Sequence, residues 1–199
     1  MKDNSKKALK HQHFIIYKPY GYLSQFINNQ TKRKGKKMLG ELYKFPEGTM
    51  AIGRLDEDSE GLLLLTTDGK TSELIRSNKV EKEYFAQVDG IITKTAIEKL
   101  ALGVEIGFEG QKYITQPCKA FKIEKDPVLP ERGKKIRNER HGPTSWVSIT
   151  LREGKFRQVR KMTAAVGFPT LRLIRVRIGE IQLNNLQPAE VIEVKKFQL

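Results

Sequence analysis

The sequence predicts an α+β fold with a largely antiparallel sheet. Segments with strand character outnumber those with helical character, and the two kinds do not alternate regularly along the chain. The 199 residues are enough for one hydrophobic core, or for one domain split into two lobes. With 38% hydrophobic and 8% aromatic residues, the composition is typical of a globular protein and argues against wholesale disorder.

The first half of the chain begins with a segment that we expect to be a flexible basic tail. Residues 1–12 are polar and rich in lysine, so a single ordered domain is predicted over residues 13–199. The apolar run Phe14–Tyr17 indicates a strand, and Pro19 and Gly21 then dictate a turn. After a charged loop over Lys32–Lys37, four elements are expected: a short helix over Met38–Tyr43, a buried strand at Leu63–Leu65, a helix over Thr71–Ser77 and a strand over Glu83–Val88.

The second half is expected to open with a helix over Lys94–Leu102, which Gly103 closes. Proline, glycine and charge are concentrated in Asp126–Pro143, which we interpret as a long surface loop of the kind that is usually functional or disordered. A further helix is predicted over Phe156–Val166. The remaining segments have strand character: Val104–Ile106, Tyr113–Ile123, Trp146–Leu151, Thr170–Arg177, Glu180–Leu183 and Val191–Lys195.

The charge balance points to a polyanionic partner. Lysine and arginine total 37 against 23 acidic residues, which gives a formal net charge of +14. Nucleic acid is the commonest partner of a protein with such an excess. An anionic membrane surface is the alternative, but it requires a basic amphipathic helix or a lipidation motif, and the sequence has neither.

Other sequence features predict a cytoplasmic protein without a metal centre. The first ten residues lack the apolar segment of a secretory signal, and no apolar stretch has the length of a membrane span. Cys118 is the only cysteine, which excludes an intrachain disulfide and a cysteine-rich metal site. The histidines also lack metal-ligand spacing, because His11 and His13 lie at the start of the chain and His141 lies in the long loop.

An acidic segment beside an apolar run is the most informative part of the chain. Residues 53–62 contain four acidic residues, one arginine and two glycines, and three further leucines follow directly. Burying carboxylates there is costly unless they are paired or hydrogen-bonded, so the segment suggests a functional carboxylate. The structural alternative is a tight strand–loop–strand unit in which Asp and Ser cap backbone groups and the leucines fill the core. The composition of the segment does not decide between the two.

The order of residues in this segment resembles a family signature. Gly-Arg-Leu-Asp, two variable residues, Ser-Glu-Gly-Leu-Leu-Leu-Leu-Thr and a later Asp-Gly are similar to the motif of the pseudouridine synthases that act on ribosomal RNA. The resemblance implies that Asp56 is the nucleophile. It also implies a mixed, mainly antiparallel sheet in two lobes with flanking helices, with the aspartate in the cleft between them. Residues 13–199 would then be one catalytic domain without an N-terminal accessory RNA-binding domain, as in the large-subunit branch of the family.

A second motif supplies arginines for the same site. Glu153–Met162 resembles the later family motif, and the resemblance implies that Arg160 pairs with Asp56. Such a guanidinium would keep a partly buried carboxylate ionised and hold it in one rotamer. A helix starting near Phe156 would place Arg157 on the same face as Arg160, with Lys155 just before it. The alternative is a solvated basic helix face.

A third motif supplies an aromatic ring. Lys82-Glu83-Tyr84 resembles the family's Lys-x-Tyr, in which the tyrosine stacks on the target uracil. Stacking a base on an aromatic side chain contributes roughly 1–3 kcal/mol, comparable with the few kcal/mol needed to unstack a nucleotide. Lys82 and Arg54 are expected to bind substrate, and Arg54 would grip a phosphate or fill the space of the extruded base. Without the resemblance, Tyr84 would be taken for a core residue and Arg54 for a surface residue.

Lys18-Pro19-Tyr20-Gly21 resembles an early family motif, although Tyr17 stands where that motif has asparagine, and we expect it to support the site. Eight basic residues between Leu151 and Arg177 are opposed by only one acid, and the loops Lys32–Lys37 and Lys134–Arg140 add two basic patches. We expect these regions to bind a ribosomal RNA stem–loop through its phosphates. Isomerisation requires no redox change or net hydrolysis, so neither a metal nor an organic cofactor is expected, and the default oligomeric state is a monomer.

Three alternatives remain open on the sequence. The substrate could be small-subunit instead of large-subunit ribosomal RNA. The protein could be a non-catalytic RNA-binding or ribosome-assembly factor on the same fold, as its charge would allow. It could also be a glycosidase that uses Asp56 with Asp58 or Glu60 as the acid, although glycosidases need water at the sugar carbon and a set separation of the two carboxyl groups.

Overall fold

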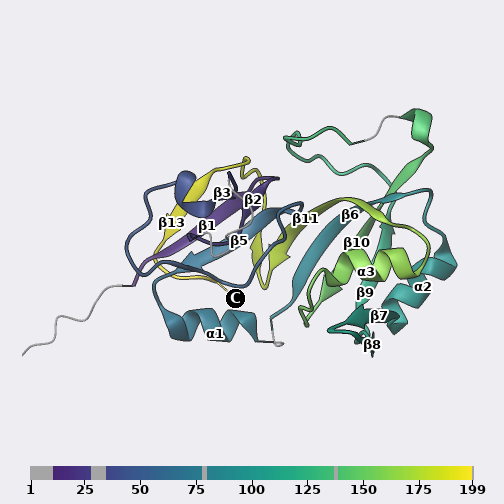
Figure 1. Ribbon diagram of the computed structural model, residues 1–199, viewed down its shortest axis with the longest axis horizontal. Coiled ribbons are helices and arrows are strands. Elements are labelled where there is room, and N and C mark those ends of the chain that lie inside the picture. Colours follow the sequence, from purple (N-terminus) through teal and green to yellow (C-terminus); the bar gives the residue numbers. More distant parts are fainter. Residues whose placement is uncertain (1–10, 28–34, 78–79, 137–138, 199) are drawn as a thin grey trace, which may run out of the picture.

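The protein is built on one long twisted sheet that spans two lobes (Figure 1). The structure, a computed structural model, describes residues 11–27, 35–77, 80–136 and 139–198. Residues 1–10 of the expected tail lie outside this range. Gln12 is already held, because its backbone N–H donates to Thr67 Oγ1 and its carbonyl accepts from the Thr67 N–H, both at 3.0 Å.

Within the described residues, the main sheet has nine strands, with the order β13-β1-β5-β11-β6-β10-β9, β4 paired to β5 and β12 paired to β11. Strands β5 and β11 are parallel, and the other neighbouring pairs are antiparallel. The predicted α+β fold with a mixed, mainly antiparallel sheet is therefore confirmed. The strands are β1 His13–Lys18, β4 Met50–Ala51, β5 Glu60–Thr66, β6 Lys82–Asp89, β9 Lys119–Ile123, β10 Thr144–Leu151, β11 Thr170–Ile178, β12 Ile181–Gln182 and β13 Val191–Val194.

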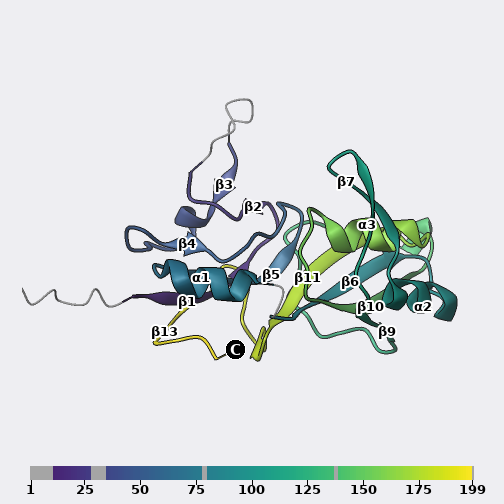
Figure 2. The same ribbon diagram turned by 90° about the horizontal axis from the view of Figure 1, so that it is seen from below.

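Helices flank the sheet in both lobes (Figures 1 and 2). Helix α1 (Gly69–Arg76) lies beside β1 and β5, whereas α2 (Lys94–Leu102) and α3 (Gln158–Ala165) lie with β6, β10 and β9. Strand β5 is buried along its whole length. Leu62 and Leu64 join one hydrophobic cluster and Leu63 and Leu65 join another, so both faces of the strand are covered. This burial on both faces explains why the sequence there is a continuous apolar run.

The two lobes meet at Gly61. Strand β5 approaches β11 through only two residue pairs, Glu60 with Ile174 and Gly61 with Arg175. Gly61 has a φ of 100°, and a Cβ atom at this position would lie 2.4 Å from the carbonyl oxygen of Arg175. Only glycine allows both this backbone conformation and this close approach.

Smaller elements differ from the sequence-based expectations. The helix expected over Met38–Tyr43 is a single 3₁₀ turn, η1 (Leu39–Glu41), next to a short parallel pair, β2 (Tyr22–Leu23) with β3 (Lys37–Met38). The single strand expected over Tyr113–Ile123 is interrupted: β8 (Gln111–Ile114) forms a hairpin with β7 (Glu105–Phe108), and β9 joins the main sheet. The long loop contains a 3₁₀ turn, η2 (Glu139–His141).

The helix expected over Phe156–Val166 begins two residues later than predicted. Arg157 is the residue before the first turn of α3, and its φ of 53° places it in the left-handed region. A non-glycine residue in this conformation costs of order 1–3 kcal/mol and is most often found at functional sites. The conformation at residue 157 therefore directs attention to the side chain that it carries.

We predict that Gly61→Ala lowers the free energy of unfolding by about 3 kcal/mol or more, because it adds both backbone strain and a clash with β11. Urea denaturation measures the change. The matched control is Gly110→Ala in the β7–β8 turn, where φ is 77° but no atom lies within 4 Å of the added methyl group. The control should lose only about 1 kcal/mol. Equal losses in the two variants would mean that the contact between β5 and β11 is not tight.

Candidate active site

Asp56 lies in the loop between β4 and β5, and this loop is fixed from two sides. Ser24 binds Leu55 twice, since its hydroxyl donates to the Leu55 carbonyl at 2.8 Å and accepts from the Leu55 N–H at 2.9 Å. The Gly21 N–H donates to the Glu57 carbonyl at 2.8 Å. The turn after Lys18 thus holds the loop in place, which is the supporting role expected for the Lys18–Gly21 motif.

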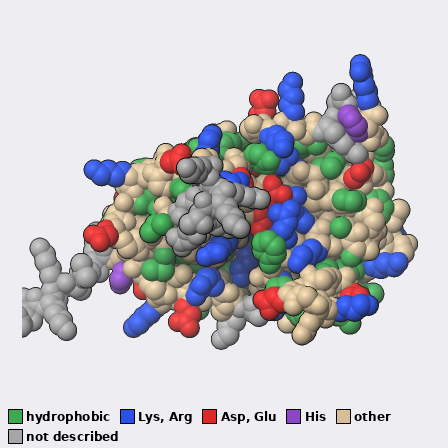
Figure 3. Space-filling model, viewed as in Figure 1, with side chains coloured by type: hydrophobic (Ala, Val, Ile, Leu, Met, Phe, Trp, Pro, Cys, Tyr) green, Lys and Arg blue, Asp and Glu red, His purple; other side chains and the backbone are tan. Residues whose placement is uncertain are grey.

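The Asp56 side chain lines a cleft of about 530 Å³ between the two lobes. Four other predicted site residues line the same cleft: Arg54, Tyr84, Lys155 and Arg157. Figure 3 shows lysine and arginine side chains gathered around acidic ones near the middle of this face. The fold therefore brings together predicted site residues that are up to 103 positions apart, counting from Arg54 to Arg157 (157 − 54).

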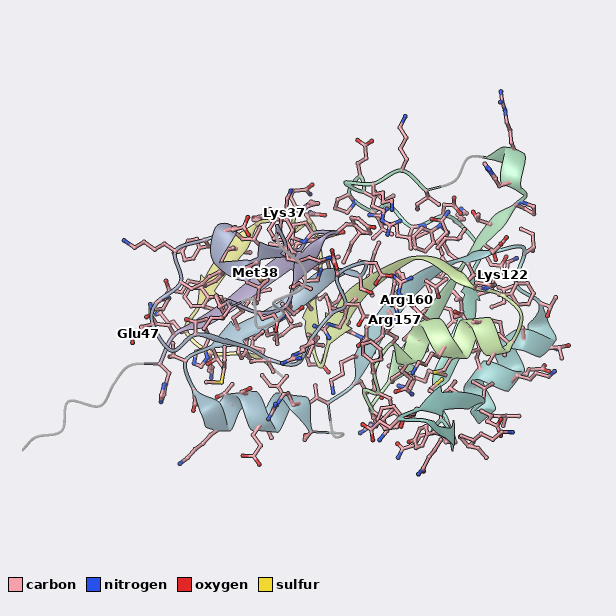
Figure 4. All side chains as sticks on the ribbon, in the orientation of Figure 1. Lys37, Met38, Glu47, Lys122, Arg157 and Arg160 are labelled. Atoms are coloured by element: carbon pink, nitrogen blue, oxygen red, sulfur yellow. The ribbon has the colours of Figure 1, made fainter. Side chains whose placement is uncertain are left out.

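The nearest guanidinium to Asp56 belongs to Arg157, which corrects the expected pairing with Arg160. Arg157 Nη1 lies 3.6 Å from Asp56 Oδ2, and the same guanidinium donates to both oxygens of Asp58, at 3.0 and 2.9 Å. Arg160 instead donates to the Asp58 carbonyl at 2.8 Å and to Ser59 Oγ at 3.3 Å. Figure 4 shows both arginines at the start of α3, between the lobes.

The start of α3 explains this arrangement. Because Arg157 has a left-handed conformation and precedes the first helical turn, its side chain does not share a helix face with Arg160. The segment before it is anchored by buried Glu153, whose carboxylate accepts from Tyr113, Gln116 and Gln158 at 2.5, 2.8 and 2.5 Å. A rigid Glu153–Gln158 turn thus presents Arg157 to the two aspartates.

The pKa values of the two aspartates are shifted in opposite directions. Burial raises the pKa of Asp56, and the nearby Arg157 opposes that rise while Asp58 adds to it. Burial also favours the neutral form of Asp58, but the hydrogen bonds from Arg157 and the charge of Arg160 outweigh it and lower the pKa of Asp58. Asp58 is thereby committed to an ion pair, whereas Asp56 is left as the less satisfied carboxylate.

Glu60 is part of a buried ionic cluster below the cleft. Arg172 donates to both Glu60 oxygens at 3.2 and 3.0 Å, and Arg132 Nε lies 3.0 Å from Glu60 Oε1. Arginines are the main side-chain partners of both Asp58 and Glu60. Since both carboxylates are engaged in ion pairs, neither is placed as the second acid that a glycosidase needs.

Lys18 is a buried cation that the sequence analysis treated only as part of a turn. Its Nζ donates to the carbonyls of Pro19 and Tyr22 at 3.0 and 2.7 Å. Burial lowers the pKa of Lys18 to about 7, although the charges of Glu60 and Asp56 oppose the shift. The sequence signal for this buried cation is a lysine that directly follows the apolar run Phe14–Tyr17, because burying a charge beside such a run costs free energy.

The other predicted residues take different places around the cleft. Tyr84 is half-buried on β6, and Arg54 is exposed at the rim. Lys155 Nζ lies 4.8 and 4.9 Å from the ring centres of Phe108 and Tyr113, so it connects the cleft to the β7–β8 hairpin. Lys82 lines an adjoining cleft of about 560 Å³ that also contains Arg54 and Tyr84. Among the described site residues, Arg160 alone lines neither of these two clefts.

The basic stretch before Arg177 does not form one exposed face. Arg172 and Arg175 are buried, and Arg177 pairs with Glu83 at 2.8 Å and with Glu81 at 3.4 Å. Of the two predicted basic loops, residues 32–34 and Arg137 lie outside the described residues. Lys36 forms an ion pair with Glu57, while Lys134 and Lys135 are exposed. Several of these charges therefore stabilise the protein itself and are not available to a ligand.

Two kinds of feature are absent from the residues that the structure describes. Those residues hold no group of three or more His, Cys, Asp or Glu side chains arranged to bind a metal ion. In the same part of the chain, no helix has the length and apolar character needed to cross a membrane.

Comparisons with known proteins identify the family to which the sequence is similar. Residues 12–165 match the sequence profile of the family described as RNA pseudouridylate synthase. A Vibrio vulnificus (strain CMCP6) protein named ribosomal large subunit pseudouridine synthase E is 41% identical over 197 residues, covering 96% of this chain and 80% of the relative. A protein of the same name from Xanthomonas campestris pv. campestris is 40% identical over 178 residues, covering 88% of this chain and 91% of the relative.

A solved structure extends the agreement to three dimensions. A crystal structure of a pseudouridylate synthase superimposes with a TM-score of 0.72 at 28% identity, covering 92% of this chain and 70% of that one. The two relatives carry the name of the large-subunit branch that the sequence analysis expected. The signature around Asp56, the two-lobed fold and these matches agree, and the chain belongs to the RNA pseudouridylate synthase family and is a pseudouridine synthase.

Proposed function

We propose that this protein converts one uridine of large-subunit ribosomal RNA to pseudouridine, with Asp56 as the nucleophile. The observation that carries the proposal is the Asp56 cleft: a half-buried carboxylate shares it with Tyr84 and with the cations Arg54, Lys155 and Arg157. The names of the relatives from Vibrio and Xanthomonas support the choice of ribosomal RNA. We further propose that the protein acts as a cytoplasmic monomer without a cofactor.

The cleft suits a single extruded nucleotide. At about 530 Å³ it is large enough for one nucleoside, which supports the proposal that the target uridine leaves its helix to enter the cleft. Tyr84 offers a ring on which the uracil stacks, and this contact offsets part of the cost of unstacking. Arg54 at the rim then grips the neighbouring phosphate or occupies the vacated space.

The reaction balances without a co-reactant. The bond between N1 of uracil and C1′ of the ribose breaks, the base rotates, and a bond between C5 and C1′ forms. The proton on C5 is lost and N1 gains one, so substrate and product are isomers. With Asp56 as the nucleophile, a carboxylate O–C1′ bond forms as the N1–C1′ bond breaks and is broken again when C5 bonds to C1′, so water must be kept from this intermediate.

The cations serve the reaction in two ways. Arg157 keeps Asp56 ionised despite its burial, which is necessary because a protonated carboxyl is not a nucleophile. The exposed cations around the cleft attract the RNA backbone, so binding should weaken steeply with added salt. A pure RNA-binding factor would have no use for a buried carboxylate facing a polyanion, and this favours the catalytic proposal over a non-catalytic one.

We expect Asp56→Asn to reduce pseudouridine formation by about 10⁴-fold or more while RNA affinity is retained or increased, because one negative charge is removed. The assay incubates the protein with a large-subunit RNA transcript and maps the modified uridines. The control is Asp126→Asn, an exposed surface aspartate, which should keep full activity. Normal activity of Asp56→Asn would end the proposal.

We expect Arg157→Gln to move the acid limb of the rate profile to higher pH. Asp56 must be ionised, so the single-turnover rate falls as the pH falls through its pKa. That pKa is already raised by burial, and loss of the opposing guanidinium raises it further. The exposed Lys99→Gln on α2 is the control and should leave the limb in place. An acid limb of Arg157→Gln that stays in place or shifts to lower pH would contradict this role.

A further inference from the structure

Arg175 is a buried cation whose hydrogen-bonding capacity is not used up. Its residue is 4% exposed, and its Nε donates to the Leu62 carbonyl at 2.8 Å. Its Nη2 is buried and has no hydrogen-bond partner among the described residues. A buried donor without a partner costs free energy, so its persistence suggests a ligand that completes the site.

Arg175 lines the cleft that adjoins the Asp56 cleft, which we call the Lys82–Arg175 cleft. It is lined by four cations, Arg54, Arg76, Lys82 and Arg175, and by one acid, the exposed Glu73. Within the described residues, no carboxylate lies within 4.0 Å of a basic nitrogen of any of these four cations. The cleft therefore carries a concentrated positive charge that the protein itself does not neutralise.

The charged form of Lys82 is disfavoured in this cleft. Among the described residues, its Nζ donates only to the carbonyls of Ser77 and Arg152, at 3.3 and 3.4 Å. Burial lowers the pKa of Lys82 to about 8, and the charge of Arg175 contributes to the shift. The residue between Lys82 and Tyr84, Glu83, offers no relief because alternate strand residues face opposite sides and its carboxylate binds Ser148 and Arg177.

The Lys82–Arg175 cleft lies next to the Asp56 cleft. Tyr84 and Arg54 line both clefts, so the two adjoin at these side chains. The Arg175 guanidinium lies 6.0 Å from the centre of the Tyr84 ring. A strand whose base stacks on Tyr84 in the Asp56 cleft must continue past this point, and its charged groups are phosphodiesters.

We propose that the Lys82–Arg175 cleft binds one backbone phosphodiester of the RNA strand next to the uridine that enters the Asp56 cleft. This inference rests on the proposed function. The guanidinium group of Arg175, which lines the cleft, and the ammonium group of Lys82 supply two charge-assisted donors for the phosphodiester's two non-bridging oxygens. The site positions the strand and does not read its sequence.

The test uses a stem–loop RNA that contains the target uridine. Single phosphodiesters on either side of the uridine are replaced, one at a time, by neutral methylphosphonates, and binding is measured for wild type and Lys82→Met. Methionine keeps much of the apolar stem of lysine, and Lys82 is only half-buried, so the variant should fold. Lys94→Met on α2, whose side chain is 92% exposed, is the matched control.

We expect one neutral linkage to weaken wild-type binding by about 10-fold, the usual effect of losing a hydrogen bond between charged groups. Lys82→Met should bind the unmodified RNA about 10-fold more weakly and lose little or nothing more at that linkage, whereas Lys94→Met should behave as wild type. Two results would overturn the site: no linkage with such an effect on wild type, or losses from the linkage and from Lys82→Met that simply multiply.

A second readout separates this inference from the proposed function. Wild-type protein is assayed for pseudouridine on the same unmodified RNA. If the uridine is converted and no linkage shows the expected dependence on Lys82, the phosphate site is wrong and the enzymatic proposal stands. If the uridine is not converted, the enzymatic proposal fails, while the linkage data still decide whether the cleft binds a phosphodiester.

Discussion

The two lobes are joined where β5 runs parallel to β11, and this contact admits only glycine at position 61. The residues on either side of it build the site. The loop that ends at Glu60 carries Asp56 and Asp58, whereas Arg175, opposite Gly61, lines the adjoining cleft. The ion pair between Glu60 and Arg172 fastens the same junction. A shift of one residue in this short register would separate the carboxylate from the tyrosine and the cations that surround it.

The acidic groups at the site differ in how well they are paired: Asp58 and Glu60 form ion pairs that stabilise the structure, and Asp56 is paired less well. Asp58 and Glu60 are satisfied by Arg157, Arg160 and Arg172, and removal of one partner from the buried Glu60–Arg172 pair is strongly destabilising. Asp56 receives only a single contact of 3.6 Å from Arg157 and stays partly desolvated. The protein thus holds one incompletely satisfied carboxylate within a framework of well-satisfied ones, which is consistent with the proposed role of Asp56 as the nucleophile.

Much of this arrangement could be predicted from sequence because it follows from local patterns. The apolar run beside Asp56 indicated a buried strand, whereas Lys82 and Tyr84 were singled out only through the resemblance to the family's Lys-x-Tyr motif. The pairing of Arg157, and not Arg160, with Asp56 could not be predicted, because it depends on the left-handed backbone at residue 157 and on where α3 begins. The partners of Glu60 could not be predicted either, because Arg132 and Arg172 come from segments 72 and 112 residues away (132 − 60 and 172 − 60).

The central claim is that a uridine leaves its helix and presents its glycosidic bond to Asp56 while its base lies on Tyr84. The crystal structure of Asp56→Asn bound to a stem–loop of large-subunit RNA measures this most directly. The account predicts an extruded uridine with its C1′ about 3–3.5 Å from the side chain at position 56 and its base stacked on the Tyr84 ring. A target uridine that stays paired in its helix, or that binds away from this cleft, would contradict it.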